Sequence, residues 1–112
     1  LARFDTCRRY IEEHFSRGIS RAEVARSVGL EESVFSRFFR KAAGATFVDY
    51  LASVRVRHAA RLLGSRRDLS VGEVARASGF RNVGAFHRQF KRKLGTTPDA
   101  YRKAANAENL VP

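Results

Sequence analysis

Two stretches of the sequence carry basic and polar side chains at the spacing of one exposed helix face. The apolar residues of the first stretch follow the i, i+3, i+4, i+7 spacing that buries the other face: Phe35, Phe38, Phe39 and Ala42. Its polar face carries Ser33, Ser36, Arg37, Arg40 and Lys41. Guanidinium and hydroxyl groups on such a face can bond to base edges in the major groove of DNA, and cationic groups can bind its phosphates.

The second stretch has the same design further along the chain. Its apolar stripe is Val83, Phe86, Phe90 and Leu94, and its polar face carries Arg81, His87, Arg88, Lys91 and Arg92. Arg37 and Arg88 stand at equivalent places in the two stretches. The two stretches therefore form a matched pair of candidate readers of nucleic acid.

An internal duplication explains the match. Residues 23–26 reappear as residues 73–76, and the similarity resumes at a shift of 51 from Phe35 and Phe86 onward. Ser20 and Ser70 each open an S-x-x-E capping box, which predicts a short helix ending near Gly29 and Gly79. A short helix, a turn and a basic amphipathic helix make a helix-turn-helix unit. The sequence thus predicts two such units, residues 20–43 and 70–94.

The remaining segments complete an all-α fold with seven helices and no strand. We expect a leading helix over about 5–15, a linking helix over about 47–63 that Thr46 caps and Gly64 ends, and a last helix over about 99–104. The domain is predicted to span 1–105, with subdomains at about 5–45 and 66–104 and a disordered tail at 106–112. A 17-residue linking helix is roughly 25 Å long, which suits two reading helices about one DNA turn apart.

Composition narrows the function classes. The chain has 112 residues, 22 of them basic, and a formal net charge of +11, which favours a polyanionic partner. A single cysteine, Cys7, excludes an internal disulfide and favours a reducing compartment. We expect no membrane span and no signal peptide, since no apolar run approaches the roughly 18 residues that a span needs. We expect no cofactor and no metal, and His14 and His58 lack ligand partners at metal spacing. No nucleophile–base pair indicates an enzyme. The start at Leu1 rather than Met indicates a fragment or a processed boundary.

The second stretch and the linking helix resemble the C-terminal DNA-binding domain of AraC/XylS-type transcriptional regulators. The residues that carry the resemblance run from Glu73-Val74-Ala75 through Gly79-Phe80, Phe86, Arg88 and Phe90-Lys91 to Gly95-Thr96-Thr97-Pro98 and Tyr101-Arg102. It covers roughly residues 11–102 and implies that the third and sixth helices enter successive major grooves. The chain departs from the family at Glu31-Glu32, where Ser-Pro is usual, and at Gly84, where Ser is frequent.

These positions define the predicted contacts with an asymmetric double-stranded DNA site. The base-reading residues are predicted to be Glu32, Ser33, Ser36, Arg37, Arg81, Asn82, Val83, His87 and Arg88. The phosphate-binding residues are predicted to be Arg40, Lys41, Lys91 and Arg92. We expect Arg37 and Arg88 to read guanine, Asn82 to pair with adenine and Val83 to touch a thymine methyl group. RNA polymerase is a candidate partner, and the expected location is the cytoplasm, at the nucleoid.

Other interpretations of the same residues remain open. Capping or plain exposure explains the presence of Ser33, Ser36 and Asn82 as well as base contact does. Packing is an alternative role for Val83, and His87 is also explained as an ordinary surface histidine. A non-specific architectural binder of nucleic acid, held by charge, is the alternative function. We expect this domain to be monomeric, with dimerisation or effector binding in a companion domain.

Overall fold

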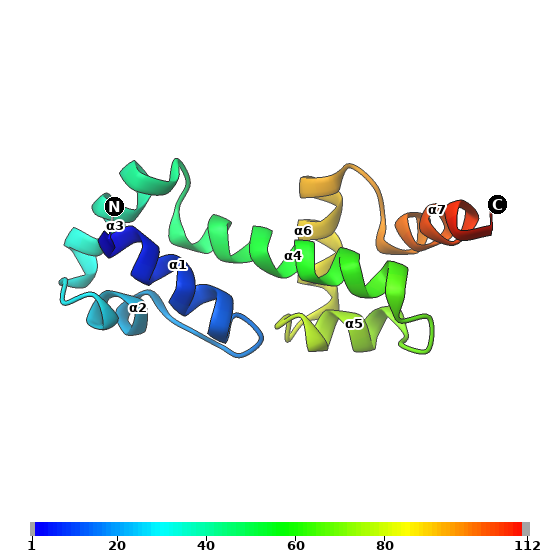
Figure 1. Cartoon of the computed structure of the whole chain (residues 1–112), viewed down its shortest axis with the longest axis horizontal. Coiled ribbons are helices and arrows are strands. Elements are labelled where there is room, and N and C mark those ends of the chain that lie inside the picture. The colour runs from blue at the N-terminus through cyan, green and yellow to red at the C-terminus, as the bar shows by residue number, and fades with distance from the viewer. Residues whose placement is uncertain (1, 111–112) are drawn as a thin grey trace. The chain divides into compact units, whose positions relative to one another are not determined.

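Seven α-helices and no strand make up the part of the chain that the structure, a computed structural model, describes, which is residues 2–110 (Figure 1). The helices are α1 (Ala2–His14), α2 (Arg21–Ser27), α3 (Glu32–Ala43), α4 (Phe47–Ser65), α5 (Val71–Ala77), α6 (Val83–Leu94) and α7 (Pro98–Leu110). The predicted all-α class with two helix-turn-helix units is confirmed.

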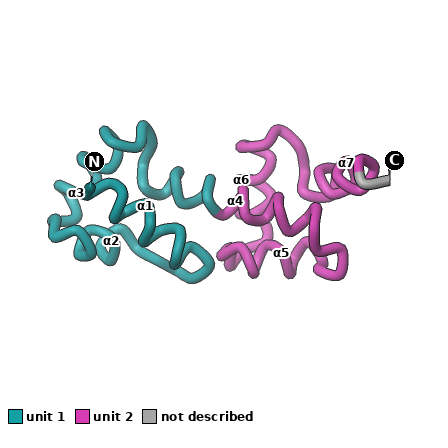
Figure 2. The backbone as a smooth tube through the Cα atoms, in the orientation of Figure 1, with its two compact units in different colours: residues 1–54 teal, residues 55–112 magenta. Residues whose placement is uncertain are grey.

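The chain divides into two compact units, residues 1–54 and 55–112 (Figure 2). In the first unit, α1, α2, α3 and the first half of α4 enclose a core in which Ile11, Val24, Phe35 and Phe39 are fully buried. The ring of Phe39 packs against Phe47, with ring centroids 5.9 Å apart. Phe35 and Phe39 of the stripe predicted for α3 therefore lie in the core and Phe38 is partly buried, whereas Ala42, the last residue of the stripe, is exposed. The polar side of α3 is left outward.

The second unit repeats this plan with α5, α6 and the second half of α4. Phe86 and Phe90 of α6 are fully buried beside Val74 of α5 and Leu63 of α4. From α7, Tyr101 packs edge-on against Phe90, with ring centroids 5.6 Å apart. The duplicated sequence thus builds two cores of the same kind, each supporting one basic helix.

The two short helices start differently, although their sequences predict the same capping box. Both serines accept the expected bond: the Glu23 N–H donates to Ser20 Oγ, and the Glu73 N–H donates to Ser70 Oγ, each over 3.1 Å. Only Glu73 completes its box, by accepting from the Ser70 N–H at 2.8 Å. The complete box predicted for the first copy was wrong, because Glu23 bonds Arg17 and Tyr10 instead. These bonds, chiefly that from Arg17, lower the pKa of Glu23 to about 2.

The end of α4 also differs from the prediction. Gly64 was expected to stop the helix, but it lies inside α4, which continues to Ser65, and its backbone is not left-handed. The physical reason lies in α7. The Arg102 guanidinium donates to the carbonyl oxygens of Leu63 at 3.2 Å and Arg66 at 3.1 Å, so the end of the helix is bonded without a glycine cap.

The segment after Asn106 is helical rather than a disordered tail. α7 extends through Leu110, and residues 111–112 of the predicted tail lie outside the described residues. Ala104, Ala105 and Ala107 are strong helix formers, and no proline or glycine interrupts them. Ala105 and Asn106 are half-buried, so the extended helix is supported by packing as well as by propensity.

Candidate nucleic-acid interface

α3 and α6 are built alike and present their polar faces to solvent. Each has 12 residues, and each ends at a left-handed glycine, Gly44 with φ 75° and Gly95 with φ 74°. The N–H of Gly44 donates to the Arg40 carbonyl, and that of Gly95 to the Lys91 carbonyl. Because one side of each helix is held by buried phenylalanines, the opposite side is fixed outward in both units.

The exposed face of α3 holds cations that no acid neutralises. The side chains of Arg37, Arg40 and Lys41 are exposed and have no hydrogen-bond or ion-pair partner within residues 2–110. Ser33 is exposed as well, and the half-buried Ser36 donates its hydroxyl to the Glu32 carbonyl at 3.1 Å. The structure therefore brings the predicted polar residues of the first unit onto one face.

Acidic residues begin α3. Glu31 takes the N-cap position but its side chain forms no capping bond. Glu32, a predicted base reader, lies 3.6 Å from Arg21 of α2 in an ion pair whose two side chains are about half exposed. The start of α3 is thus tied to α2 by charge rather than by a cap.

The start of α6 is capped by Asn82. Its Oδ1 accepts from the Ala85 N–H at 2.9 Å, so the capping interpretation of Asn82 holds, while the amide NH₂ group remains as a donor. His87 donates from Nδ1 to the Val83 carbonyl at 2.9 Å, which leaves Nε2 for an external hydrogen bond. Both residues can therefore bond a base edge without losing their internal bonds.

The remaining predicted residues of α6 stand clear of the core. The apolar stripe predicted for α6 was wrong at both ends, since Val83 is 41% exposed and Leu94 is 40% exposed. This exposure argues against simple packing as the role of Val83. The predicted cations at the start of α6 and along its face are exposed: Arg81, Arg88, Lys91 and Arg92. Arg55 on α4 is partly buried, and this burial, with the nearby charge of Arg81, lowers its pKa. Positive charge therefore gathers around the beginning of α6 as well as along its face.

One hollow beside α3 adds a residue that the sequence did not single out. A groove of about 220 Å³, which we call the basic groove, is lined by Arg21, Ser36, Arg37, Arg40, Thr46, Phe47 and Val48. The sequence around Arg21 indicates only a capping motif, Ser20-Arg21-Ala22-Glu23, and not a binding residue. The signal that could have found it is the duplication, since its counterpart in the second copy is the uncharged Val71.

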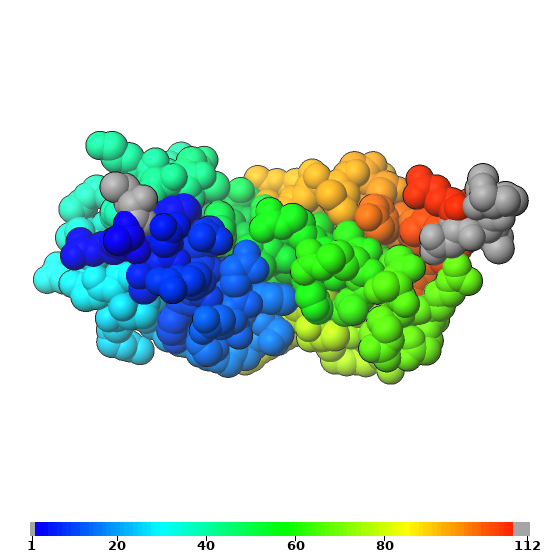
Figure 3. Space-filling model, in the orientation of Figure 1, coloured from blue at the N-terminus to red at the C-terminus, as the bar shows by residue number. Residues whose placement is uncertain are grey.

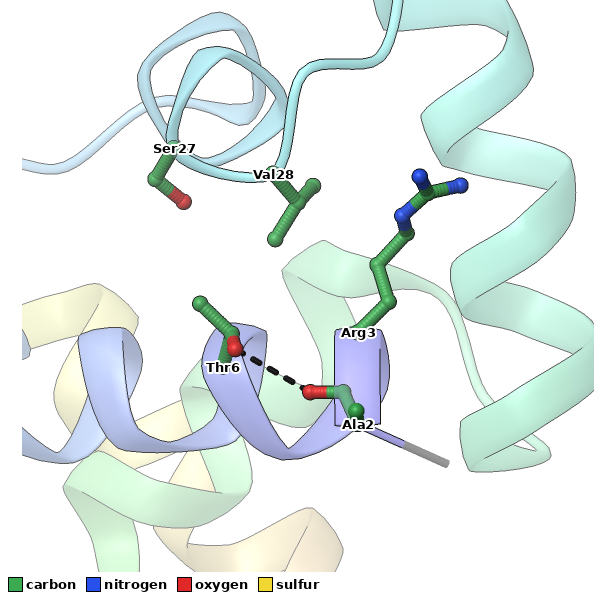
Figure 4. Close-up of a pocket in the computed structure, with 5 residues that line it drawn as sticks. All are labelled: Ala2, Arg3, Thr6, Ser27 and Val28. Carbon is green, nitrogen blue, oxygen red and sulfur yellow. Dashed lines mark hydrogen bonds between the residues drawn. The ribbon is translucent and has the colours of Figure 1, made fainter.

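Other surfaces of the first unit offer less chemistry. α1 covers one face of this unit (Figure 3), and its exposed residues are of mixed sign, including Arg8, Arg9, Glu12 and Glu13. A hollow of about 550 Å³ between α1 and the end of α2 is lined by Ala2, Arg3, Thr6, Ser27 and Val28 (Figure 4). Arg3 is its one charged lining residue, and Thr6 is already bonded to the Ala2 carbonyl at 3.0 Å. We assign it no role.

The described residues form neither a metal-ligand cluster nor a membrane-spanning helix. Among residues 2–110, no three His, Cys, Asp or Glu side chains gather where they could hold a metal ion. None of the helices described has the length and apolar character needed to cross a membrane.

Comparison with known proteins gives a consistent result. Residues 24–104 match a family described as a helix-turn-helix domain. The chain is 33% identical over 107 residues to YijO, an uncharacterised helix-turn-helix type transcriptional regulator of Escherichia coli K12, and 34% identical over 97 residues to the transcriptional regulator GlxA of Rhizobium meliloti. These matches cover 96% and 87% of the chain but 38% and 30% of the relatives, so the chain spans about a third of their length.

A solved structure extends the similarity to the whole fold. The chain superimposes on the DNA-binding domain of AdpA, a global transcriptional factor solved with a target DNA, with a TM-score of 0.88. Identity is 32%, and the match covers 97% of each chain. A probable AraC family transcriptional regulator from Rhodopseudomonas palustris shares the fold at 24% identity, with a TM-score of 0.83.

Proposed function

Because this chain belongs to the AraC-type helix-turn-helix family of transcription regulators, we propose that α3 and α6 bind a specific double-stranded DNA site by entering successive major grooves. One observation carries this proposal: each helix buries two phenylalanines and exposes a polar face on which arginine and lysine side chains lack an ion-pair partner among the described residues. These side chains are Arg37, Arg40 and Lys41 on α3 and Arg88, Lys91 and Arg92 on α6. The target DNA in the solved AdpA complex supports the same class of ligand.

Within this interface, Arg88 is the proposed guanine reader of the second unit. It is exposed in the middle of α6, and a guanidinium can donate two parallel hydrogen bonds to guanine O6 and N7. His87 lies on the same helix and Asn82 caps it, and both carry groups that can bond neighbouring bases. Val83 offers an apolar contact to a thymine methyl group. Arg81, Lys91 and Arg92 supply cations for the flanking phosphates.

The first unit is proposed to read different bases. Arg37 and Arg88 are identical, but the other equivalent residues of the two copies differ. When the copies are aligned, Ser36 corresponds to His87, Glu32 to Val83 and Ser33 to Gly84. A carboxylate such as that of Glu32 accepts from cytosine N4, whereas a valine contacts thymine. One copy of the domain should therefore recognise an asymmetric site, bound as a monomer.

We further propose that the domain acts in the cytoplasm, at the nucleoid, and that regulation reaches RNA polymerase. No catalytic role is proposed, since the family comprises transcriptional regulators. Sedimentation of the domain with a duplex tests whether the domain binds as a monomer, and we expect a one-to-one complex. A two-to-one complex would contradict it.

A competition assay separates specific binding from the alternative, charge-driven binding. Duplexes are first selected from a random pool on the domain, and a selected duplex then competes with a shuffled duplex of the same composition. We expect the selected duplex to win by a factor on the order of a thousand or more at physiological salt. Equal competition by both duplexes, with a steep salt dependence, would identify a non-specific binder.

A further inference from the structure

The basic groove gathers three guanidinium groups from two helices. Arg21 is the first residue of α2, Arg37 and Arg40 lie one turn apart on α3, and the start of α4 closes the groove. No acidic residue lines it. Arg37 and Arg40 have no ion-pair partner in the described chain, and Arg21 has the half-exposed Glu32. The groove is therefore a concentrated positive site that an anion can enter.

Backbone donors at the start of α4 add to this charge. The Asp49 N–H donates to Thr46 Oγ1 at 3.1 Å and the Tyr50 N–H donates to the Thr46 carbonyl at 2.9 Å. The N–H groups of Phe47 and Val48, both groove residues, have no hydrogen bond within residues 2–110. They stand at the positive end of a 19-residue helix, where free N–H groups bind phosphate oxygens.

The apolar side of the groove indicates what kind of anion fits. Val48 is 64% exposed at the edge of the groove, next to the arginines. A nucleic-acid backbone carries an apolar sugar beside every phosphate, whereas free phosphate or sulfate has nothing to place there. A backbone phosphate thus matches both the charged and the apolar lining.

We propose that the basic groove binds one phosphate group of the DNA backbone, held by Arg21, Arg40 and the Phe47 and Val48 N–H groups, and that the second unit has no equivalent site. This inference rests on the proposed DNA binding and adds a contact to it. The groove runs beside α3, so that a phosphate bound there fixes the register of the helix on the duplex.

The second copy of the duplication carries different residues at the positions that form the basic groove in the first copy. Val71 replaces Arg21, which removes one cation, and Pro98 replaces Phe47, which removes one N–H donor. Asp99 replaces Val48 and places a carboxylate at the start of α7. Arg88 and Lys91 keep the charges on α6, but the residues after α6 that would complete a phosphate site are different.

The first unit is therefore held on the duplex by a contact with the DNA backbone, while the second unit depends more on contacts with the bases. Arg37 also lines the basic groove, so its predicted guanine contact has a rival role there. A changed base preference in Arg37→Ala would assign it to a base, and a uniform loss of affinity would assign it to the phosphate.

The test combines two protein variants with a matched control. Arg21→Ala and Arg40→Ala each remove a groove cation, and Arg9→Ala removes an exposed cation of α1 outside the groove. Dissociation constants are measured against salt for a selected duplex and a shuffled one. We expect each groove variant to lose affinity for both duplexes by the same factor, on the order of ten, with a salt slope lower by about one. Losses no larger than that of Arg9→Ala would overturn the proposal.

Replacing single phosphates with neutral methylphosphonates locates the contact. At the position of the phosphate that the basic groove binds, the replacement should weaken binding by the wild-type protein. The same replacement should not weaken binding by Arg40→Ala any further, because that variant has already lost the contact. Additive losses at every position would contradict the assignment. Sodium phosphate at fixed ionic strength should not compete, and competition would instead identify a free-anion site. A wild-type protein that does not prefer the selected duplex would refute the proposed function, while the salt slopes would still test the groove.

Discussion

Arg21 Nε lies 3.6 Å from Glu32 Oε1, and this ion pair joins the first residue of α2 to the first residue of α3. An ion pair between half-exposed side chains contributes about 0–1 kcal/mol to stability. Its greater consequence concerns binding, because Arg21 also lines the basic groove. A phosphate that enters the groove must compete with Glu32 for the guanidinium.

Removing the charge of Glu32 should therefore strengthen binding to DNA of any sequence. In Glu32→Gln, Arg21 is released and an acid beside the DNA is lost, so we expect affinity for a shuffled duplex to rise several-fold. When Arg21→Ala is already present, Glu32→Gln should raise the affinity for the shuffled duplex by a smaller factor. Dissociation constants of the single and double variants measure this coupling.

Glu31→Gln is the control, since Glu31 is exposed beside Glu32 and forms no ion pair in the described chain. It removes the same charge without releasing Arg21. If Glu31→Gln and Glu32→Gln gain equally, and Arg21→Ala changes neither gain, the competition for Arg21 does not exist.

Acid should weaken the first unit through Glu23. Its pKa falls from 4.5 to about 2 because the folded state bonds its carboxylate to Arg17 and Tyr10. A depressed carboxyl pKa stabilises the fold above about pH 4.5, and that contribution disappears as the pH falls towards about 2. Glu23→Gln should therefore be less stable than wild type at neutral pH and nearly equal to it at about pH 2. Urea unfolding midpoints across this range check it, and a difference that does not change with pH would refute the prediction.

His58 should cause a second acid-induced loss of stability, which begins at a higher pH than the loss caused by Glu23. Its ring lies partly buried on α4, with Nδ1 3.0 Å from the hydroxyl of the fully buried Ser78, and burial lowers its pKa below 6.5. A lowered histidine pKa means that stability is complete above about pH 6.5 and declines as the pH falls below it. His58→Gln should remove this decline while the acid transition of Glu23 remains. An unchanged pH profile between about 8 and 5 would count against it.

Two glycine substitutions should act in opposite directions. Gly64 is inside α4 with ordinary helical backbone, and an added methyl group would lie 3.7 Å from the Ala105 side chain, at contact distance. Gly64→Ala should stabilise the protein by about 0.5–1 kcal/mol. Gly44→Ala, at φ +75°, should destabilise it by about 1 kcal/mol or more. Thermal unfolding of both variants measures the contrast, and a loss of stability in Gly64→Ala would show that the prediction is wrong.

Local signals in the sequence were enough to predict most of the fold. Ser20 and Ser70 marked the starts of two short helices, and the spacing of Phe35, Phe39, Phe86 and Phe90 identified the buried faces, because helix periodicity depends only on near neighbours. The errors arose where distant residues decide. Gly64 does not end α4, because Arg102, which lies 39 residues after Leu63, bonds the last carbonyls.

The candidate site divides in the same way. Arg37 and Arg88 could be placed on exposed faces from periodicity alone, and the capping alternative for Asn82 was already open. The basic groove could not be predicted, because Arg21 reaches it from another helix and Phe47 contributes only its backbone. Glu23 likewise took its partners from α1 and the loop after it rather than from its own capping box.

The base preferences of wild type and Arg88→Ala, obtained by selecting random duplexes and sequencing them, test the central claim most directly. We predict an asymmetric wild-type site with two dissimilar halves. Arg88→Ala should relax one guanine position in one half, at a cost of about 1–3 kcal/mol, and leave the other half unchanged. A palindromic wild-type site, or identical preferences for wild type and Arg88→Ala, would contradict reading by two unequal units.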